Sequence, residues 1–420
     1  MTTMWISTRR LACALGLVMA GPSTAAEPWT LERVLAEAAA MQPDSVALQA
    51  LSRGAALDAA AARSLPPPMW RAGVANLPVT GGEAFDLNAD DMTMRMFGIE
   101  QAWPSRALRE ANAGMREAQA RMWEAEAAMQ SRMRQERAGM AWIEAWIATR
   151  RIDLHEAQIE LLQQAEAAAV AAAAEGADVA DALEWQAMRA MHELEHAREQ
   201  QDLAQARADL GALLGVTIED FAAELPQWPL PDAALLRRSL GQLPELGRVD
   251  AEAAEAQSEL AMRKAESRPQ WEWMLSYGER MPGMSDMASL EVRVSFDALF
   301  GTRQSQLEAA ALARIDAAEA RHAAQERRFL GEIEAALAAY ANARAAMQVI
   351  EQRLRPLREQ QLALAEARYA QGSGELMPVF EARRQRQELE LERLMTLEAE
   401  WRARLQLRRL DASHHQGATP

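Results

Sequence analysis

An internal duplication is the feature that most constrains this sequence. Four short anchors recur in the same order and with nearly the same separation: Gln42-Pro43-Asp44 with Leu243-Pro244-Glu245, Pro68-Met69-Trp70 with Pro269-Gln270-Trp271, Pro104-Ser105-Arg106 with Gly301-Thr302-Arg303, and Gly176 with Gly372. Shared alanine-rich composition would not keep four anchors in order. The sequence therefore predicts two repeats of one structural plan, residues 27–215 and residues 233–410.

The first 26 residues have the pattern of a secretory signal peptide. Arg9 and Arg10 precede an apolar stretch at residues 11–20, and small residues end the segment at Ala26. This order of basic, apolar and small residues is typical of exported proteins. We therefore expect residues 1–26 to be removed and the rest of the chain to be exported.

Two further segments are expected to lack regular structure. Residues 216–232 contain Pro226, Pro229 and Pro231, which predicts an irregular linker, or equatorial belt, between the repeats. Residues 411–420 are expected to form a disordered tail.

The charge balance excludes nucleic acid as a partner. The net charge is −16, and it becomes −18 when Arg9 and Arg10 are removed, because residues 1–26 contain no acidic residue. Such a chain repels phosphate groups. Cys13 is the only cysteine and lies in the signal, so the mature chain is expected to have no disulfide and no lipid anchor. No cofactor motif accompanies this composition.

Each repeat contains a pair of expected strands bounded by proline. They cover residues 69–77 and 91–102 in the first repeat, and residues 270–278 and 288–296 in the second. Their length suits tilted membrane strands, whereas no later segment is apolar enough for a spanning helix. Four strands cannot close a barrel, and open edges cannot stand in lipid, so we expect a barrel shared between protomers.

The alternation in residues 91–102 suggests which side of this sheet faces lipid. Met92, Met94 and Met96 share one face, whereas Thr93 and Arg95 share the other. Since strand side chains alternate between faces, we expect the methionines to face lipid and the polar residues to face water.

Long helices follow each pair of strands. Residues 106–174 and 301–371 read as helical rods that extend on the order of 100 Å. Heptad spacing predicts coiled-coil seams through Ile147 and Leu161 in the first rod and through Leu330, Ile333 and Tyr340 in the second. Pro356 is expected to interrupt the second rod.

Each rod ends in a predicted helical hairpin tip. The tips are residues 175–181 and residues 371–378. Gly372 and Gly374 can adopt the left-handed conformation that ends a helix, and Pro378 suits the first turn of the next helix. The expected fold class is therefore mostly α with a small β part.

This pattern resembles the TolC-like outer-membrane efflux channels. The Y-x-x-G segment of that family is similar to Tyr369-Ala370-Gln371-Gly372, which Leu376 and Val379 follow. Gly176 and Leu183 occupy the corresponding positions in the first repeat. The resemblance covers the whole mature chain. The heavy-metal-cation branch is suggested by three segments: Asn76-Leu77-Pro78, Phe85-Asp86-Leu87 and Met92-Thr93-Met94.

The resemblance implies a homotrimer in the outer membrane of a Gram-negative bacterium. Three chains would share a twelve-stranded barrel in lipid and a helical tunnel in the periplasm. The tips at Gly176, Gly372 and Gly374 would dock onto a periplasmic adaptor and an inner-membrane pump of the resistance-nodulation-division class. The exported solutes would be copper, silver, zinc, cobalt or cadmium cations, with drug efflux as the alternative.

The resemblance also implies a periplasmic gate made of polar residues at the tips. Glu381 and Tyr369 match gate positions of the family, and Asp181 and Glu184 face the same region. Carboxylates gathered around one axis need donors in the closed state, and Tyr369, Arg383 or Arg384 could supply them. The sequence departs from the family pattern at Pro378, because family members carry a second acidic gate residue at that position.

Three other interpretations compete with a passive channel. The segment His192-Glu193-Leu194-Glu195-His196 matches the H-E-x-x-H motif of zinc peptidases, but it lies in an Ala- and Glu-rich rod, so a solvated helix face is favoured over catalysis. Met281, Met284 and Met287 offer thioethers to a soft metal. Finally, the chain could be an exported coiled-coil scaffold. We expect no enzyme activity.

Overall fold

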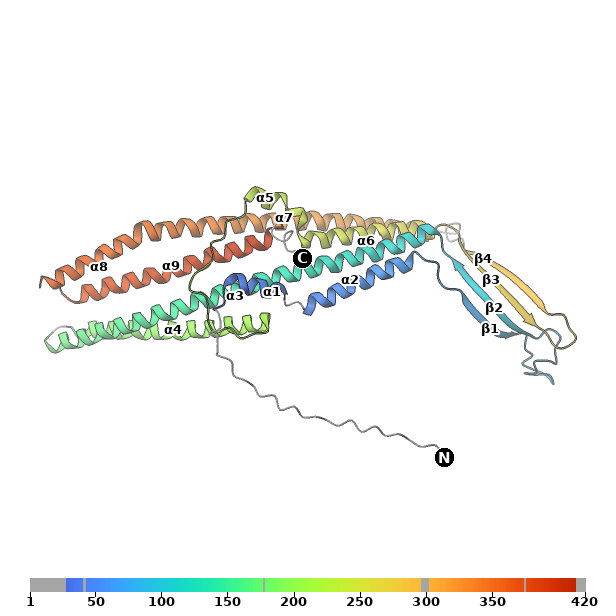
Figure 1. The fold of residues 1–420 in the computed structure, drawn as a ribbon, viewed down its shortest axis with the longest axis horizontal. Helices are drawn as coiled ribbons and strands as arrows, with labels where there is room; N and C mark the ends of the chain where they lie inside the picture. The colour runs from blue at the N-terminus through green and yellow to red at the C-terminus, as the bar shows by residue number, and fades with distance from the viewer. Residues whose placement is uncertain (1–27, 41–42, 177, 296–301, 374, 413–420) are drawn as a thin grey trace, which may run out of the picture.

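The computed structural model describes residues 28–40, 43–176, 178–295, 302–373 and 375–412. The predicted signal, residues 1–26, lies outside them, as do Gly374 and residues 296–301. The molecule is a long rod with a β-sheet at one end and two helical hairpin tips at the other (Figure 1). The elements in chain order are α1 (Leu31–Ala40), α2 (Pro43–Ala62), β1 (Met69–Ala75), β2 (Met94–Trp103), α3 (Arg106–Ala174), α4 (Val179–Leu214), α5 (Ala233–Arg238), the 3₁₀ turn η1 (Leu240–Gln242), α6 (Pro244–Glu266), β3 (Gln270–Glu279), β4 (Met287–Ser295), α7 (Arg303–Val349), the π turn η3 (Ile350–Leu354), α8 (Arg355–Ala370) and α9 (Met377–Leu410).

The four predicted strands form one antiparallel sheet in the order β1-β2-β3-β4. Trp70 lies opposite Ile99, Phe97 opposite Tyr277, and Leu275 opposite Leu290. β1 ends before Asn76, whose φ is 57°, because a left-handed residue turns the chain away from the strand. β2 begins at Met94, so the predicted strand residue Met92 lies outside it.

The methionines of β2 do not lie on the more apolar face of the sheet. Met94 and Met96 share a face with Glu100, since all three alternate along β2. On that face Glu100 forms an ion pair with Arg71 at 2.6 Å, and Glu272 forms one with Arg293 at 3.2 Å. Alternation identifies residues that share a face, but it does not identify which face is apolar.

The opposite face of the sheet is the apolar one. Its large exposed side chains come from all four strands: Trp70, Val74, Phe97, Trp103, Trp271, Leu275, Tyr277, Leu290 and Val292. Trp70 is 82 % exposed and Leu290 is 70 % exposed. A single chain therefore leaves a broad apolar surface in contact with its surroundings.

The first rod is a continuous helix, α3, whereas the second is divided. The Ser105 hydroxyl caps α3 by accepting from the Leu108 N–H at 3.2 Å. In the second rod, η3 separates α7 from α8 immediately before Pro356. Proline removes an amide donor and its ring crowds the preceding carbonyl, which a π turn accommodates. The interruption predicted at Pro356 is confirmed.

The seams are confirmed in part. Ile147 and Leu161 are buried in α3, and Ile333 is buried in α7. Leu330, however, is 40 % exposed, and the adjacent Phe329 takes the buried position at 4 %. The large Phe329 ring fills the cluster formed with α9 and the η1 region, so Phe329 takes the place of Leu330, and Ile333 keeps its predicted buried position.

The largest apolar cluster among the described residues lies in the middle of the rod, and the linker, residues 216–232, packs against it through Ile218 and Phe221. Trp142 and Trp146 of α3 are buried, and their indole N–H groups donate to the carbonyls of Trp29 at 3.0 Å and Ala222 at 2.9 Å. Trp29 also pairs with Phe221 in a parallel bridge. The segment predicted as an irregular linker therefore packs against the middle of the rod through residues such as Phe221 and Ala222.

The ordered chain extends further than predicted at its C-terminal end. Asp411 and Ala412 are buried, and the Asp411 carbonyl accepts from Arg132 Nη2 at 2.9 Å. The expected disordered tail is therefore wrong for these two residues, because a guanidinium binds the backbone there. Residues 413–420 lie outside the described residues.

Candidate gate and helical tips

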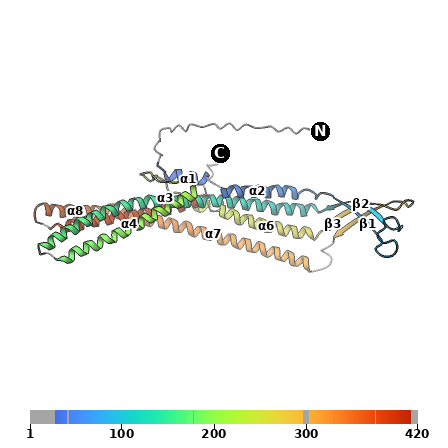
Figure 2. The same cartoon turned by 90° about the horizontal axis from the view of Figure 1, so that it is seen from below.

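The two predicted tips lie at the same end of the rod, far from the sheet (Figures 1 and 2). Gly176 follows α3 with φ +105°, and Gly372 follows α8 with φ +69°. The amide of Gly372 donates to the Tyr369 carbonyl at 3.0 Å, and Ser373 N–H donates to the Arg368 carbonyl at 3.1 Å. Glycine is favoured at such positions because it has no Cβ to crowd the backbone at positive φ.

The two hairpins are joined just behind their tips by an apolar cluster. Phe380 of α9 packs with Trp185 of α4 and Leu162 of α3, and all three side chains are buried. Leu376 and Met377, which open α9, lie against the same cluster. The start of α9 is therefore held against the α3/α4 hairpin by apolar packing.

Glu381 lies directly behind this cluster and is already paired within its own helix. Arg384 donates to both Glu381 oxygens, at 2.9 and 2.6 Å, and Gln385 Nε2 donates to one of them at 2.6 Å. The Arg384 hydrogen bonds, opposed by partial burial, lower the pKa of the Glu381 carboxyl. Glu381 therefore stays charged at neutral pH, as a gate carboxylate requires.

The other predicted gate residues are dispersed around the tips. Arg383 pairs with Glu366 across the α8/α9 hairpin at 2.9 Å, rather than with Glu381. Tyr369 is 48 % exposed, and Glu184 is exposed. Asp181 lies in the first turn of α4. Of the five predicted gate residues whose side chains the structure describes, only Glu381 and Arg384 are paired with each other.

The H-E-x-x-H residues contribute to the contact between α3 and α4 instead of a cleft. His192 Nδ1 lies 3.1 Å from His155 Nδ1, and His196 Nε2 lies 3.2 Å from Glu156. Glu193 pairs with Arg189 at 2.6 Å. Among the described residues, no group of three or more His, Cys, Asp or Glu side chains is placed to hold a metal ion. Glu193, which would be the general base of a zinc peptidase, is therefore already paired with Arg189.

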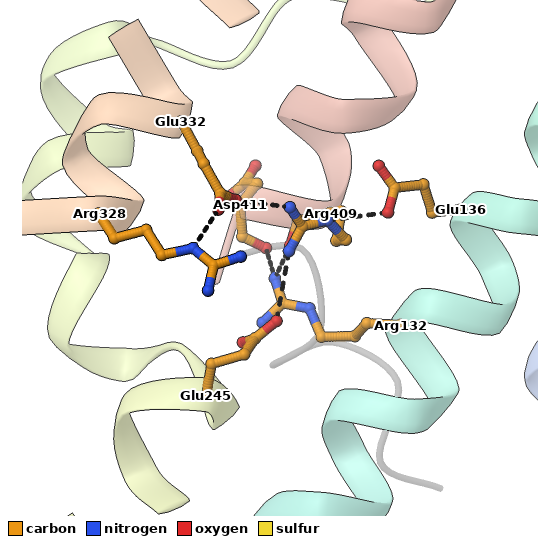
Figure 3. A network of polar contacts seen from close by, with 7 residues as sticks. All are labelled: Arg132, Glu136, Glu245, Arg328, Glu332, Arg409 and Asp411. Carbon is orange, nitrogen blue, oxygen red and sulfur yellow. Dashed lines mark hydrogen bonds and ion pairs between the residues drawn. The ribbon is translucent and has the colours of Figure 1, made fainter. Parts of the chain in front are cut away.

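Sequence reasoning missed a charged network in the middle of the rod (Figure 3). Arg409 of α9 pairs with Glu136 of α3 at 2.9 Å, Glu245 of α6 at 3.4 Å and Glu332 of α7 at 2.9 Å. Burial, the largest effect, raises the pKa of the Glu136 carboxyl, and Arg409 opposes that rise. The network ties four helices together between the sheet and the tips. Only the spatial arrangement reveals it, since its members have no common spacing.

The three methionines that could offer thioethers to a soft metal, Met281, Met284 and Met287, do not lie together in one strand or loop. Met287 is the first residue of β4, whereas Met281 and Met284 lie in the preceding loop. The three predicted metal contacts therefore do not share one element.

No protein-family model matches the sequence, and neither does any curated protein. Solved structures do match it. VceC, an outer membrane protein of Vibrio cholerae, matches with TM-score 0.75 at 17 % identity, over 91 % of this chain and 96 % of that one. The Campylobacter jejuni CmeC outer membrane channel matches with TM-score 0.75 at 11 % identity, over 93 % and 87 %. CusC, described for its transmembrane channel formation, matches with TM-score 0.73 at 16 % identity, over 91 % and 92 %.

The chain has the TolC-like fold. The predicted fold class is confirmed in its mostly helical content, its four antiparallel strands and its long helical hairpins. The matches span nearly the whole of each chain, so the TolC-like fold includes both repeats and the belt. VceC, CmeC and CusC are similar to this chain by nearly equal TM-scores, and the fold therefore does not distinguish a metal branch from others.

Among the described residues, no helix is both long and apolar enough to cross a membrane.

Proposed function

We propose that this protein is the outer-membrane channel of a tripartite efflux system and conducts solutes passively. One observation carries the proposal. One face of the sheet is mostly apolar, with the Arg95–Glu279 pair at its end, whereas the other face carries the Arg71–Glu100 and Glu272–Arg293 pairs. The sheet lies at the far end of the rod from the helical tips. A sheet with this division suits lipid on one side and water on the other.

The edges of the sheet support a homotrimer. β1 and β4 form the two edges, and each pairs with one strand only among the described residues. Exposed backbone groups at an edge cannot remain unpaired in lipid, so β1 of one protomer must pair with β4 of the next. Three copies would give the twelve strands of a closed barrel.

The helices support a tunnel that crosses the periplasm of a Gram-negative bacterium. α3 has 69 residues, and at 1.5 Å per residue it extends on the order of 100 Å from the sheet. The tips would therefore lie deep in the periplasm. We propose that they dock onto a periplasmic adaptor and, through it, onto an inner-membrane pump of the resistance-nodulation-division class.

We propose further that the tips form the gate. Three copies of Glu381 and Glu184 around one axis would repel one another unless each carboxylate has a donor, and Arg384 supplies one for Glu381. Tyr369 and Glu184 are exposed in the single chain and are free to meet a neighbouring protomer. Opening then requires that contacts between protomers break.

The finer proposal for the substrate is a heavy-metal cation, namely copper, silver, zinc, cobalt or cadmium. Its support is the similarity of three sequence segments, including Asn76-Leu77-Pro78, to the metal-cation branch. Deletion of the gene should lower tolerance to one of these metals. Unchanged metal tolerance with lost drug tolerance would assign the channel to drug efflux instead.

Membrane fractionation tests the proposed location and assembly. The channel should appear in the outer membrane and migrate on gels as a trimer that heat converts to monomer. A soluble periplasmic protein that migrates as a monomer without heating would support the coiled-coil scaffold and would reject the channel.

A further inference from the structure

Two methionine sulfur atoms lie over Gly278 on the face of the sheet that carries Glu100 and Arg71, and a third methionine lies opposite this glycine on the next strand. Gly278 is the ninth residue of β3, and in the register of the sheet it lies opposite Met96 on β2 and Met287 on β4. Residues directly opposite in antiparallel strands share a face. Met94, two residues before Met96, shares it as well.

The absence of a side chain at Gly278 creates the space that the thioethers occupy. A Cβ at this position would lie 2.9 Å from Met96 Sδ and 3.2 Å from Met94 Sδ. Both sulfur atoms therefore lie over the same point of the β3 backbone. Met287 lies directly opposite Gly278 on the other neighbouring strand, on the same face of the sheet, and is 47 % exposed, so this part of the face is accessible from outside the protein.

This placement is not explained by lipid contact or by the core. The same face carries the Arg71–Glu100 and Glu272–Arg293 ion pairs, whereas the opposite face holds the aromatic and aliphatic side chains. Met94 and Met96 are half-buried over Gly278, whereas Met287 is exposed on the same face. A thioether there can serve as a ligand, because sulfur is a soft donor that prefers Cu(I) to hard cations.

We propose that Met94, Met96 and Met287 form a binding site for a soft monovalent cation, Cu(I) or Ag(I). The position of the site on the wall of a pore rests on the proposed channel function, but binding itself does not. Met281 and Met284 lie in the loop before β4, and Met284 is 42 % exposed, so they can deliver or receive the ion at the outer end of the sheet. Met274 is excluded, because its sulfur accepts from Arg71 Nη1 at 3.7 Å.

Silver titration of the purified, detergent-solubilised full chain tests the site. We expect one Ag(I) per protomer, and the combined substitution Met94→Leu, Met96→Leu and Met287→Leu should weaken binding at least tenfold. Leucine keeps nearly the same volume while it removes the sulfur. The control substitutes Met191→Leu and Met395→Leu, two exposed methionines on α4 and α9, and should bind silver as the unchanged protein does.

Two further measurements make the result decisive. Zn²⁺ should not compete with Ag(I), and Gly278→Ala should weaken silver binding, because its Cβ would displace both sulfur atoms. Should the triple variant fail to fold, Met96→Leu alone should still weaken binding. Silver affinity that is unchanged in the triple or single variant, or equally reduced in the control, would overturn the site.

The outcomes also separate this site from the channel. A protein that conducts ions but has no methionine-dependent silver binding retains the proposed function and loses the site. A protein that binds silver through these residues but never conducts retains the site and loses the channel.

Discussion

His155 Nδ1 lies 3.1 Å from His192 Nδ1, and this pair joins α3 to α4 behind the tips. Burial lowers the pKa of both imidazoles. His192 further lowers the pKa of His155, and Arg384, the partner of Glu381, further lowers that of His192. Glu195 raises the pKa of both imidazoles and so opposes these shifts. His196 and Arg151 lower the pKa of His155 further. The pair therefore favours its neutral form.

Acid should destabilise the protein through this pair. Each imidazole has a lower pKa in the folded chain than its ordinary value of 6.5, so the unfolded chain binds more protons as pH falls below that value. The free energy of unfolding should then fall from pH 6.5 downward. In denaturant titrations at pH 7.5 and 5.5, His155→Gln with His192→Gln should reduce this loss. The control is His322→Gln, which lies in a separate contact with Asp250 and should leave the loss unchanged. An equal loss in the double variant would contradict the assignment.

Arg409→Met should destabilise the middle of the rod. Arg409 is 13 % exposed, and its removal leaves three carboxylates, Glu136, Glu245 and Glu332, without their shared cation. Breaking a buried charge network of this kind lowers the free energy of unfolding by about 3 kcal/mol. Chemical denaturation measures the change. Arg198→Met removes one exposed pair with Glu195 on the same helix and should cost less than about 1 kcal/mol. Equal costs for the two variants would reject the network as a stabilising feature.

Gly372→Ala should loosen the second tip. The φ of +69° places a Cβ against the backbone, which costs about 1 kcal/mol. Amide hydrogen exchange should therefore speed up around the tip. Gly331→Ala is the matched control, because Gly331 lies inside α7 with open space around its Cβ position. That substitution should stabilise the helix by about 0.5 to 1 kcal/mol. Exchange rates that rise equally in both variants would show that the tip conformation is not the cause.

Tyr369→Phe combined with Glu381→Ala should raise the conductance of the channel in planar bilayers while the trimer stays intact. The reason is that the proposed gate loses a hydroxyl and a carboxylate at the tip. Glu359→Ala on α8 is the control, because this exposed residue pairs with Arg355, away from the tip. Conductance that is unchanged in the double variant would reject these residues as the gate.

Much of the fold could be predicted because each repeat carries strong local signals. Proline bounds the strands, and Gly176 and Gly372 end the helices, so the element order is confirmed. Features that depend on how distant segments meet could not be predicted. Arg409 finds its partners on three other helices, and Phe329 replaces Leu330 because of the cluster it enters. Alternation within β2 alone does not show which of its faces lies on the apolar side of the sheet, because most of the large apolar side chains there belong to β1, β3 and β4.

The candidate site was predicted less well than the fold. The tips themselves follow from local glycine and proline chemistry, and their positive φ angles agree. Glu381 and Arg384 are three residues apart on one helix, a spacing that predicts a pair. The predicted partnership of Arg383 with the gate is not seen within one chain, because Glu366 on the neighbouring helix is a nearer acceptor.

Bilayer recordings on the purified trimer test the central claim most directly. If the protein is a passive outer-membrane channel, the trimer should conduct ions in a planar bilayer without nucleotide or any other energy source, and heat-dissociated monomer should not. A heat-modifiable trimer that inserts but never conducts, even with Tyr369→Phe and Glu381→Ala in place, would contradict the account.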